Sequence, residues 1–219
     1  MVSKSVKDGR EALAKLPRVE LGIWPTPVRP LERMGSALGG ASLFIKRDDM
    51  NGLGPGGNKV RSLEYLLASA LEKGADTLIA SGPAQSNLCT LAACAAAKLG
   101  LGAELVHNAA RPARLEGNAL LNHLCGANSH FIGAGTDEFQ RAAAVTQLEQ
   151  ELKSAGKNPY VILLGASTGL GAVGYIQVVA ELAEQCQKEG HKIRHLYVPG
   201  GNGGVAAGIV YGNYILGSP

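Results

Sequence analysis

The sequence has few aromatic residues, no long apolar run and no apolar amino-terminal segment. Aromatic residues make up 5% of its 219 positions. No stretch approaches 18 uninterrupted apolar residues, so we expect no transmembrane helix and no membrane partner. Residues 1–16 carry charges every few positions, a pattern that does not fit a secretory signal. We therefore expect a cytoplasmic protein.

The sequence also lacks a large excess of charge of one sign and closely spaced pairs of cysteines. The formal net charge is only +3, and the lysine and arginine residues are scattered. Nucleic-acid binding needs a basic patch or stripe, so we expect no nucleic-acid partner. No C-x-x-C pair is present. We therefore expect reduced thiols rather than a disulfide, and no metal site. The cysteines are Cys89, Cys94, Cys125 and Cys186.

Small and apolar residues are abundant instead, and they alternate in a pattern of strand, loop and helix. This mixture predicts an α/β protein with parallel sheets and helices on both faces. Strands are predicted at residues 42–46, 77–80, 103–107, 129–132, 160–164 and 193–198. Helices are predicted from Asn58, as N-cap, to Gly74, and at residues 88–99, 115–124, 137–155, 172–188 and 205–216. The last helix ends where a parallel sheet normally receives another strand, so the fold is expected to be incomplete.

A glycine-rich loop at residues 200–204 lies between a predicted strand and a predicted helix. Glycine lets the backbone approach a ligand closely, and helix N-termini favour anions, so a phosphate is the natural ligand. A tight turn without a ligand is the alternative. Residues 201–206 also fit the relaxed dinucleotide pattern G-x-G-x-x-A. That pattern needs an acidic residue about 20 positions further on, beyond the end of this sequence.

Two further loops place reactive side chains at predicted helix starts. Lys59 follows a glycine-rich loop, where the positive end of the helix dipole disfavours the charged ammonium. A neutral amine is what Schiff-base chemistry requires, although an ordinary surface lysine is the alternative. Ser86, with the neighbouring amides, would form a carboxylate clamp. A plain N-cap serine is equally consistent with the local sequence.

Several ordered motifs along residues 17–217 resemble the D-cysteine desulfhydrase and 1-aminocyclopropane-1-carboxylate (ACC) deaminase group of pyridoxal 5'-phosphate (PLP) enzymes. They are KRDD at 46–49, GGNKVR at 56–61, LEY at 63–65, GADTL at 74–78, QSN at 85–87, AAAKLG at 95–100, the segment 165–175 and GNGGVAAG at 201–208. Motifs in this number and order are far more specific than one glycine loop.

The resemblance implies a tryptophan-synthase-β-like fold, fold type II. Two three-layer α/β/α domains with mainly parallel sheets would form it, and the group extends further at the C-terminus. Residues 58–156 would form the smaller domain. Residues 1–57 and 157–219 would form the larger, PLP-binding domain. A homodimer is implied for the complete protein.

The resemblance also implies residue roles. Lys59 would hold PLP as a Schiff base and, with Ser86, act in catalysis. Asn87 would bind the ring hydroxyl of the cofactor, and the substrate would contact Ser86, Asn87 and Leu88. The other cofactor contacts would be Asn58, Gly200, Gly201, Asn202, Gly203, Gly204 and Val205. In this group Leu88 is usually His or Gln, and Val205 is usually Thr.

The activity implied is that of a PLP-dependent lyase, deaminase or hydrolase acting on a small amino acid, such as D-cysteine or ACC. Two alternatives stay open. The chain could be a non-catalytic PLP-binding fragment or subunit, or a nucleotide-binding α/β module that uses residues 200–204. The part of the group beyond residue 219 normally supplies the partner of the pyridine nitrogen and a tyrosine. We therefore expect residues 1–219 alone to be catalytically silent and poorly stable.

Overall fold

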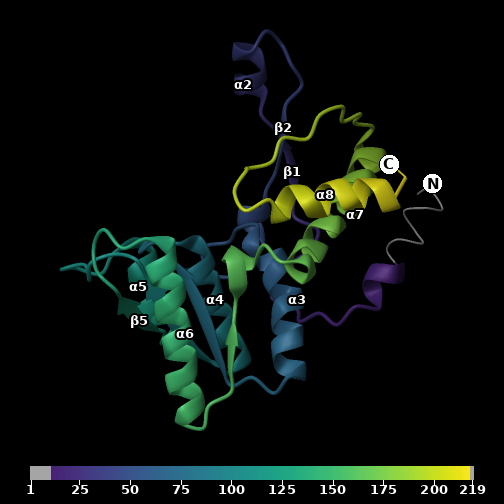
Figure 1. The fold of residues 1–219 in the computed structure, drawn as a ribbon. Helices are drawn as coiled ribbons and strands as arrows, with labels where there is room; N and C mark the ends of the chain where they lie inside the picture. Colours follow the sequence, from purple (N-terminus) through teal and green to yellow (C-terminus); the bar gives the residue numbers. More distant parts are fainter. Residues whose placement is uncertain (1–10, 218–219) are drawn as a thin grey trace.

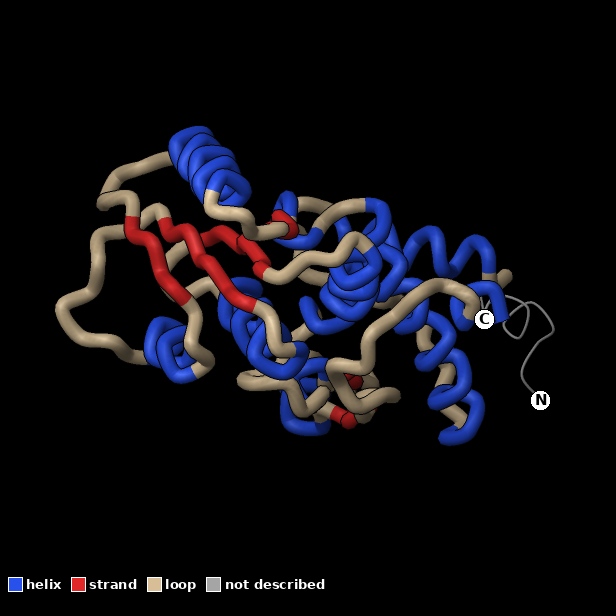
Figure 2. The backbone as a smooth tube through the Cα atoms, turned by 90° about the horizontal axis from the view of Figure 1, so that it is seen from below, coloured by secondary structure: helices blue, strands red, loops and turns tan. Residues whose placement is uncertain are grey.

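The computed structural model describes residues 11–217, and its centre is one parallel sheet of order β5-β4-β3-β6 (Figures 1 and 2). The strands are β3 (Thr77–Gly82), β4 (Gly102–His107), β5 (Asn128–Phe131) and β6 (Pro159–Val161). Neighbouring parallel strands need crossover connections, usually helices. These are α4 (Asn87–Leu99), α5 (Gly117–Leu124) and α6 (Glu138–Ser154).

Helices cover both faces of this sheet, as Figure 2 shows. Successive side chains of a strand point to opposite faces, and β3 follows this rule. Leu78 packs with the apolar residues of α4 and of α3 (Lys59–Glu72). Ile79 packs instead with Val145 of α6. The predicted α/β class and the parallel sheet are therefore confirmed.

The ends of these helices follow from their sequences. Ser86 caps α4, because its side chain accepts a hydrogen bond from the Cys89 amide. Gly74, in the left-handed region at φ +69°, lies directly after the end of α3, as predicted. Asn58 is the N-cap residue of α3, as predicted, but its side chain makes no capping hydrogen bond. Its Nδ2 donates to Tyr175 Oη at 3.2 Å instead, so a tertiary contact replaces the local one.

A small antiparallel ribbon lies apart from the main sheet. It consists of β1 (Val28–Pro30) and β2 (Phe44–Lys46), joined through α2 (Glu32–Ala37). The short 3-10 helix η1 (Asp48–Met50) then leads toward α3. In Figure 1 this segment projects away from the sheet, with α2 at its tip.

The C-terminal part consists of η2 (Leu163–Ala166), α7 (Gly169–Glu189) and α8 (Gly204–Ile215). α8 lies directly on α7 through Gly208 and Gly212. A Cβ at Gly208 would clash with the Ala172 carbonyl oxygen, so this close packing requires glycine. Among residues 11–217 no helix is both long and apolar enough to cross a membrane.

Two predicted strands differ from the structure. The strand predicted at 160–164 is shorter, because η2 begins at Leu163. The strand predicted at 193–198 is wrong, since this segment is irregular and Tyr197 is 87% exposed. Its apolar composition favours a strand, but a strand forms only where a neighbour satisfies its backbone amides and carbonyls. Within residues 11–217 no strand lies beside it.

Candidate functional site

A cleft of about 660 Å³ opens at the carboxyl end of β3, between the start of α3, the start of α4 and α6. Ligands of open parallel sheets bind at this edge. The cleft brings together residues from five separate segments of the chain. The predicted site residues that line it are Asn58, Lys59, Ser86, Asn87, Leu88 and Asn202.

Lys59 is the first residue of α3 and is half-buried in the cleft wall. Burial lowers the pKa of its ammonium group. The glycine-rich loop before Lys59 packs closely against neighbouring parts of the chain. A Cβ at Gly56 would clash with the Asp49 carbonyl oxygen, and one at Gly57 would lie 2.5 Å from Asn87 Nδ2. Both glycines have positive φ, so the close approach of this loop to Asn87 depends on glycine here.

Asn87 and Ser86 lie at the N-terminus of α4. Asn87 Nδ2 donates to the Gly56 carbonyl oxygen at 3.1 Å, which joins this helix start to the loop before Lys59. Ser86 Oγ accepts from the Cys89 amide at 3.3 Å. This is the capping role that the local sequence left open. The bond uses one lone pair of Oγ, so the hydroxyl retains its capacity to donate.

The glycine loop reaches the same cleft through Asn202. Gly203, at φ +82°, is the N-cap of α8. A Cβ at Gly204 would lie 2.9 Å from the Ser167 backbone, so the loop lies against the turn after η2. Gly200, Gly201 and Gly203 are exposed, and Val205 is half-buried. None of these residues lines the cleft, and Gly204 does not line it either.

Most of the other residues lining the cleft were not predicted as site residues, among them Glu138, Arg141 and Ser167. Arg141 Nη1 donates to Asn108 Oδ1 at 2.8 Å, and its Nη2 lies 3.4 Å from Glu138 Oε1. Both residues belong to α6, which the sequence indicates only as a helix of the fold. The first turns of α6 border the cleft because of the way this helix crosses the sheet.

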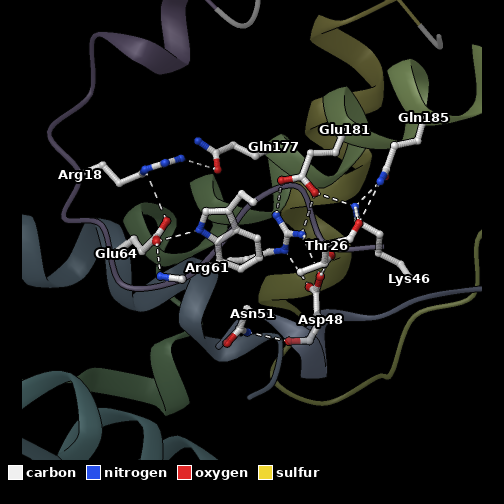
Figure 3. A network of polar contacts seen from close by, with 12 residues as sticks. Arg18, Thr26, Lys46, Asp48, Asn51, Arg61, Glu64, Gln177, Glu181 and Gln185 are labelled. Atoms are coloured by element: carbon white, nitrogen blue, oxygen red, sulfur yellow. Dashed lines mark hydrogen bonds and ion pairs between the residues drawn. The ribbon is translucent and has the colours of Figure 1, made fainter. Parts of the chain in front are cut away.

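A buried polar network supports the segment around Lys59 (Figure 3). Arg61 donates to Asp48 at 2.7 and 2.8 Å and to Glu181 of α7 at 2.9 Å, and its guanidinium stacks on Trp24. Burial alone would lower the pKa of Arg61, but the hydrogen bonds and charges of Asp48 and Glu181 raise it. Arg61 is therefore held charged. Lys46 adds a second cation, 2.7 Å from Glu181. The network joins η1, α3 and α7.

The four cysteines are free, as expected from the sequence. Cys89, in the first turn of α4, is buried, and burial raises its pKa to about 11. Cys94 Sγ lies 3.4 Å from Cys125 Sγ. Among residues 11–217 no three His, Cys, Asp or Glu side chains gather as a metal site would need.

Comparison with known proteins identifies the class to which this fold and cleft belong. The pattern of the family "Pyridoxal-phosphate dependent enzyme" matches residues 19–215. The chain therefore belongs to this family, and PLP, the predicted cofactor, is confirmed. A continuous match of this length does not favour a nucleotide-binding module.

The relatives within the family agree with the resemblance found from the motifs. The chain is 42% identical over 204 residues to the "Putative 1-aminocyclopropane-1-carboxylate deaminase" of Pyrococcus horikoshii, covering 93% of this chain and 61% of that protein. It is 40% identical over 205 residues to the D-cysteine desulfhydrase of Klebsiella pneumoniae subsp. pneumoniae, covering 91% of this chain and 61% of that protein. The chain thus spans about three fifths of the length of these relatives.

Two solved structures share the fold. A crystal structure of an ACC deaminase homologue superposes with a TM-score of 0.85 at 38% identity, covering 99% of this chain and 63% of that chain. Apo diaminopropionate ammonia lyase of Escherichia coli superposes with a TM-score of 0.69 at 20% identity, covering 95% and 58%, which shows the fold alone. Fold type II is confirmed. The expected label of hydrolase is wrong, because the relatives are named for deamination and for release of sulfide.

The cleft residues fit the cofactor of the family. A half-buried lysine whose pKa burial lowers can present a neutral amine. Asn87, which also lines the cleft, offers a side-chain amide. The loop before α8 lies at a helix N-terminus, where a phosphate is favoured. A cleft of about 660 Å³ lies within the range of small-molecule sites, about 300–1,000 Å³.

Proposed function

We propose that this chain is the PLP-binding part of an enzyme that removes ammonia or sulfide from a small amino acid, such as D-cysteine or ACC. The carrying observation is that Lys59, Ser86, Asn87 and Asn202, from separate segments, line one cleft at the carboxyl end of the sheet. The names of relatives about 40% identical support the same reaction class.

When bound, PLP supplies an electron sink for negative charge at the substrate α-carbon. Lys59 would hold the cofactor covalently through its Nζ. The amine must be neutral to react with an aldehyde, and burial of Lys59 favours that form. With a substrate in the cleft, Lys59 Nζ would move a proton at the α- or β-carbon of the substrate.

Ser86 and Asn87 would act on the substrate and the cofactor from the start of α4. The helix N-terminus attracts a carboxylate, and the Ser86 hydroxyl can add a hydrogen bond to it. The Asn87 amide, already bound to the Gly56 carbonyl, would bind the ring hydroxyl of PLP. Leu88 is buried and apolar, so it would give the substrate side a surface without a proton donor.

The loop at 200–204, with Asn58 and Val205, would surround the cofactor phosphate. Its exposed glycine amides precede α8, and Val205 offers no hydroxyl to the phosphate. We further propose residues 58–156 as the smaller domain and residues 1–57 with 157–219 as the larger one. For the complete enzyme we propose a cytoplasmic homodimer.

Reductive trapping tests the assignment of Lys59. Borohydride treatment of the protein with PLP, followed by peptide mapping, should place the pyridoxyl label on Lys59. Lys59→Ala should abolish the label. Lys98→Ala should keep the label. Lys98 lies in the last turn of α4, where its Nζ donates to the Leu21 carbonyl oxygen. A dominant label on another lysine contradicts the proposal.

A further inference from the structure

The residue before Lys59 is held by a buried tyrosine of another helix. Tyr175 of α7 is 2% exposed. Its hydroxyl donates to the Asn58 carbonyl oxygen at 3.2 Å and accepts from Asn58 Nδ2 at 3.2 Å. One phenol group therefore fixes both the main chain and the side chain of a single residue, 117 positions away in the sequence.

The same tyrosine contacts the helix that follows the glycine loop. A Cβ at Gly208 of α8 would lie 2.7 Å from Tyr175 Cβ, so α8 rests directly on this residue. A Cβ at the adjacent Gly174 would clash with the Arg61 carbonyl oxygen, so α7 also touches the first turn of α3. Tyr175 thus lies between the two segments that the proposed function assigns to the lysine and to the phosphate.

We propose that Tyr175 is a positioning residue that sets the orientation of Lys59 through Asn58. This inference rests on the proposed function, because it concerns the lysine assigned there. Asn58 is in helical conformation, and its carbonyl oxygen also accepts from the Arg61 amide. Fixing this carbonyl and the side-chain amide fixes the peptide plane from which Lys59 begins. The Lys59 side chain then leaves the helix in one direction, toward the cleft.

The hydroxyl keeps its donor proton over the working range of the protein. Burial raises the pKa of Tyr175 above its ordinary value, so the group is a neutral phenol at and above neutral pH. Its ring also packs between helices, and replacement by phenylalanine would preserve that packing. The substitution therefore removes the two hydrogen bonds to Asn58, together with the interaction of the hydroxyl with Ser62.

The test compares Tyr175→Phe with Tyr65→Phe. Tyr65 is equally buried, and its hydroxyl accepts from Gln177 Nε2 at 2.6 Å, so its variant also loses a buried hydroxyl bond between α3 and α7. The first readout is the pH profile of Lys59 acylation in the cofactor-free chain, followed by mass spectrometry. The second is the dissociation constant for PLP, from the absorbance of the bound cofactor.

In Tyr175→Phe the acylation profile of Lys59 should shift toward that of an exposed lysine. PLP affinity should fall about 3- to 10-fold, as expected for the loss of one or two hydrogen bonds. Tyr65→Phe should change both readouts less than about 2-fold. If Tyr175→Phe does not fold, Tyr175→Met, which also lacks the hydroxyl, takes its place in the same comparison.

An unchanged Lys59 profile in Tyr175→Phe, or equal changes in both variants, overturns the inference. The acylation readout needs no cofactor, so it decides the role of Tyr175 even where PLP binding fails. Absence of PLP from Lys59 in the parent protein would instead refute the proposed function. The two failures are therefore distinguishable.

Discussion

Large apolar and aromatic side chains are buried in the sheet region but exposed in the C-terminal region. In the sheet region, residues 77–161, Leu78, Leu91 and Leu105 are 0–1% exposed. In the C-terminal region, residues 190–217, Tyr197 is 87% exposed and Tyr214 is 80% exposed. The difference comes from the layers around each region, because composition alone does not bury a side chain.

Each strand in the middle of the sheet has neighbours at both edges and helices on both faces. The C-terminal region has α7 on one side of α8, and residues 193–198 have no strand beside them within residues 11–217. Figure 1 shows the connection from α7 looping back above α8 before it enters the start of that helix. Contiguous exposed apolar residues mark surfaces that bind other segments or chains.

The largest effect is expected between these two regions of the chain, where Arg61 joins η1 and α3 to α7. Arg61→Met leaves Asp48 without its buried cation and Glu181 with Lys46 alone, which should cost about 3–5 kcal/mol of unfolding free energy. Arg47→Met, which breaks an exposed pair with Asp49, should cost about 1 kcal/mol or less. Urea unfolding monitored by circular dichroism measures both. Similar losses in the two variants would show that the buried network does not hold α3 on α7.

A smaller effect is expected from the glycine loop of the C-terminal region. Gly203→Val places a β-branched residue at φ +82°, so the loop must change its path and PLP affinity should fall about 10-fold. Gly190→Val imposes the same strain at φ +72° at the end of α7, away from the cleft. PLP titration of both folded variants is the measurement. Equal affinities would mean that this loop does not hold the cofactor.

Ser86→Ala separates capping from catalysis in the sheet region. Loss of the cap on α4 should lower the unfolding free energy by about 1 kcal/mol. Asp137→Ala removes the cap of α6 at a similar cost, and only Ser86→Ala should also impair turnover in an active form of the enzyme. Thermal melts and activity assays with D-cysteine and ACC measure the two quantities. Normal turnover in Ser86→Ala would restrict this serine to capping.

The smallest effect on stability is expected on the exposed face of α8. Tyr214→Ser should change the unfolding free energy by less than about 0.5 kcal/mol, because its side chain is already in water. Self-association should fall, since an exposed apolar side chain is removed. Light scattering and urea unfolding test this, with Val210→Ser as a second exposed substitution on the same helix. A large loss of stability would mean that α8 is packed more completely than its exposure indicates.

Much of the site could be predicted from local sequence. The periodicity of α3 and α4 and the residues at their starts indicated that Lys59, Ser86 and Asn87 follow loops at the ends of strands. Because the carboxyl ends of parallel strands meet at one edge, Ser86 and Asn87 lie at the cleft. Lys59 follows a strand of the separate antiparallel ribbon, and the loop through Gly56 and Gly57 brings it to the same cleft. These glycines can be recognised in the sequence, because glycine adopts positive φ at little cost.

Other features were decided only by the tertiary structure. The pairing of Asn58 with Tyr175 and the contact of Arg61 with Glu181 join residues 117 and 120 positions apart, so no local pattern contains them. Arg141 borders the cleft because of where α6 crosses the sheet. Residues 193–198 have the composition of a strand but no neighbouring strand among the described residues. A helix satisfies its own backbone hydrogen bonds and can be predicted from its own residues, whereas a strand depends on a partner that its sequence does not name.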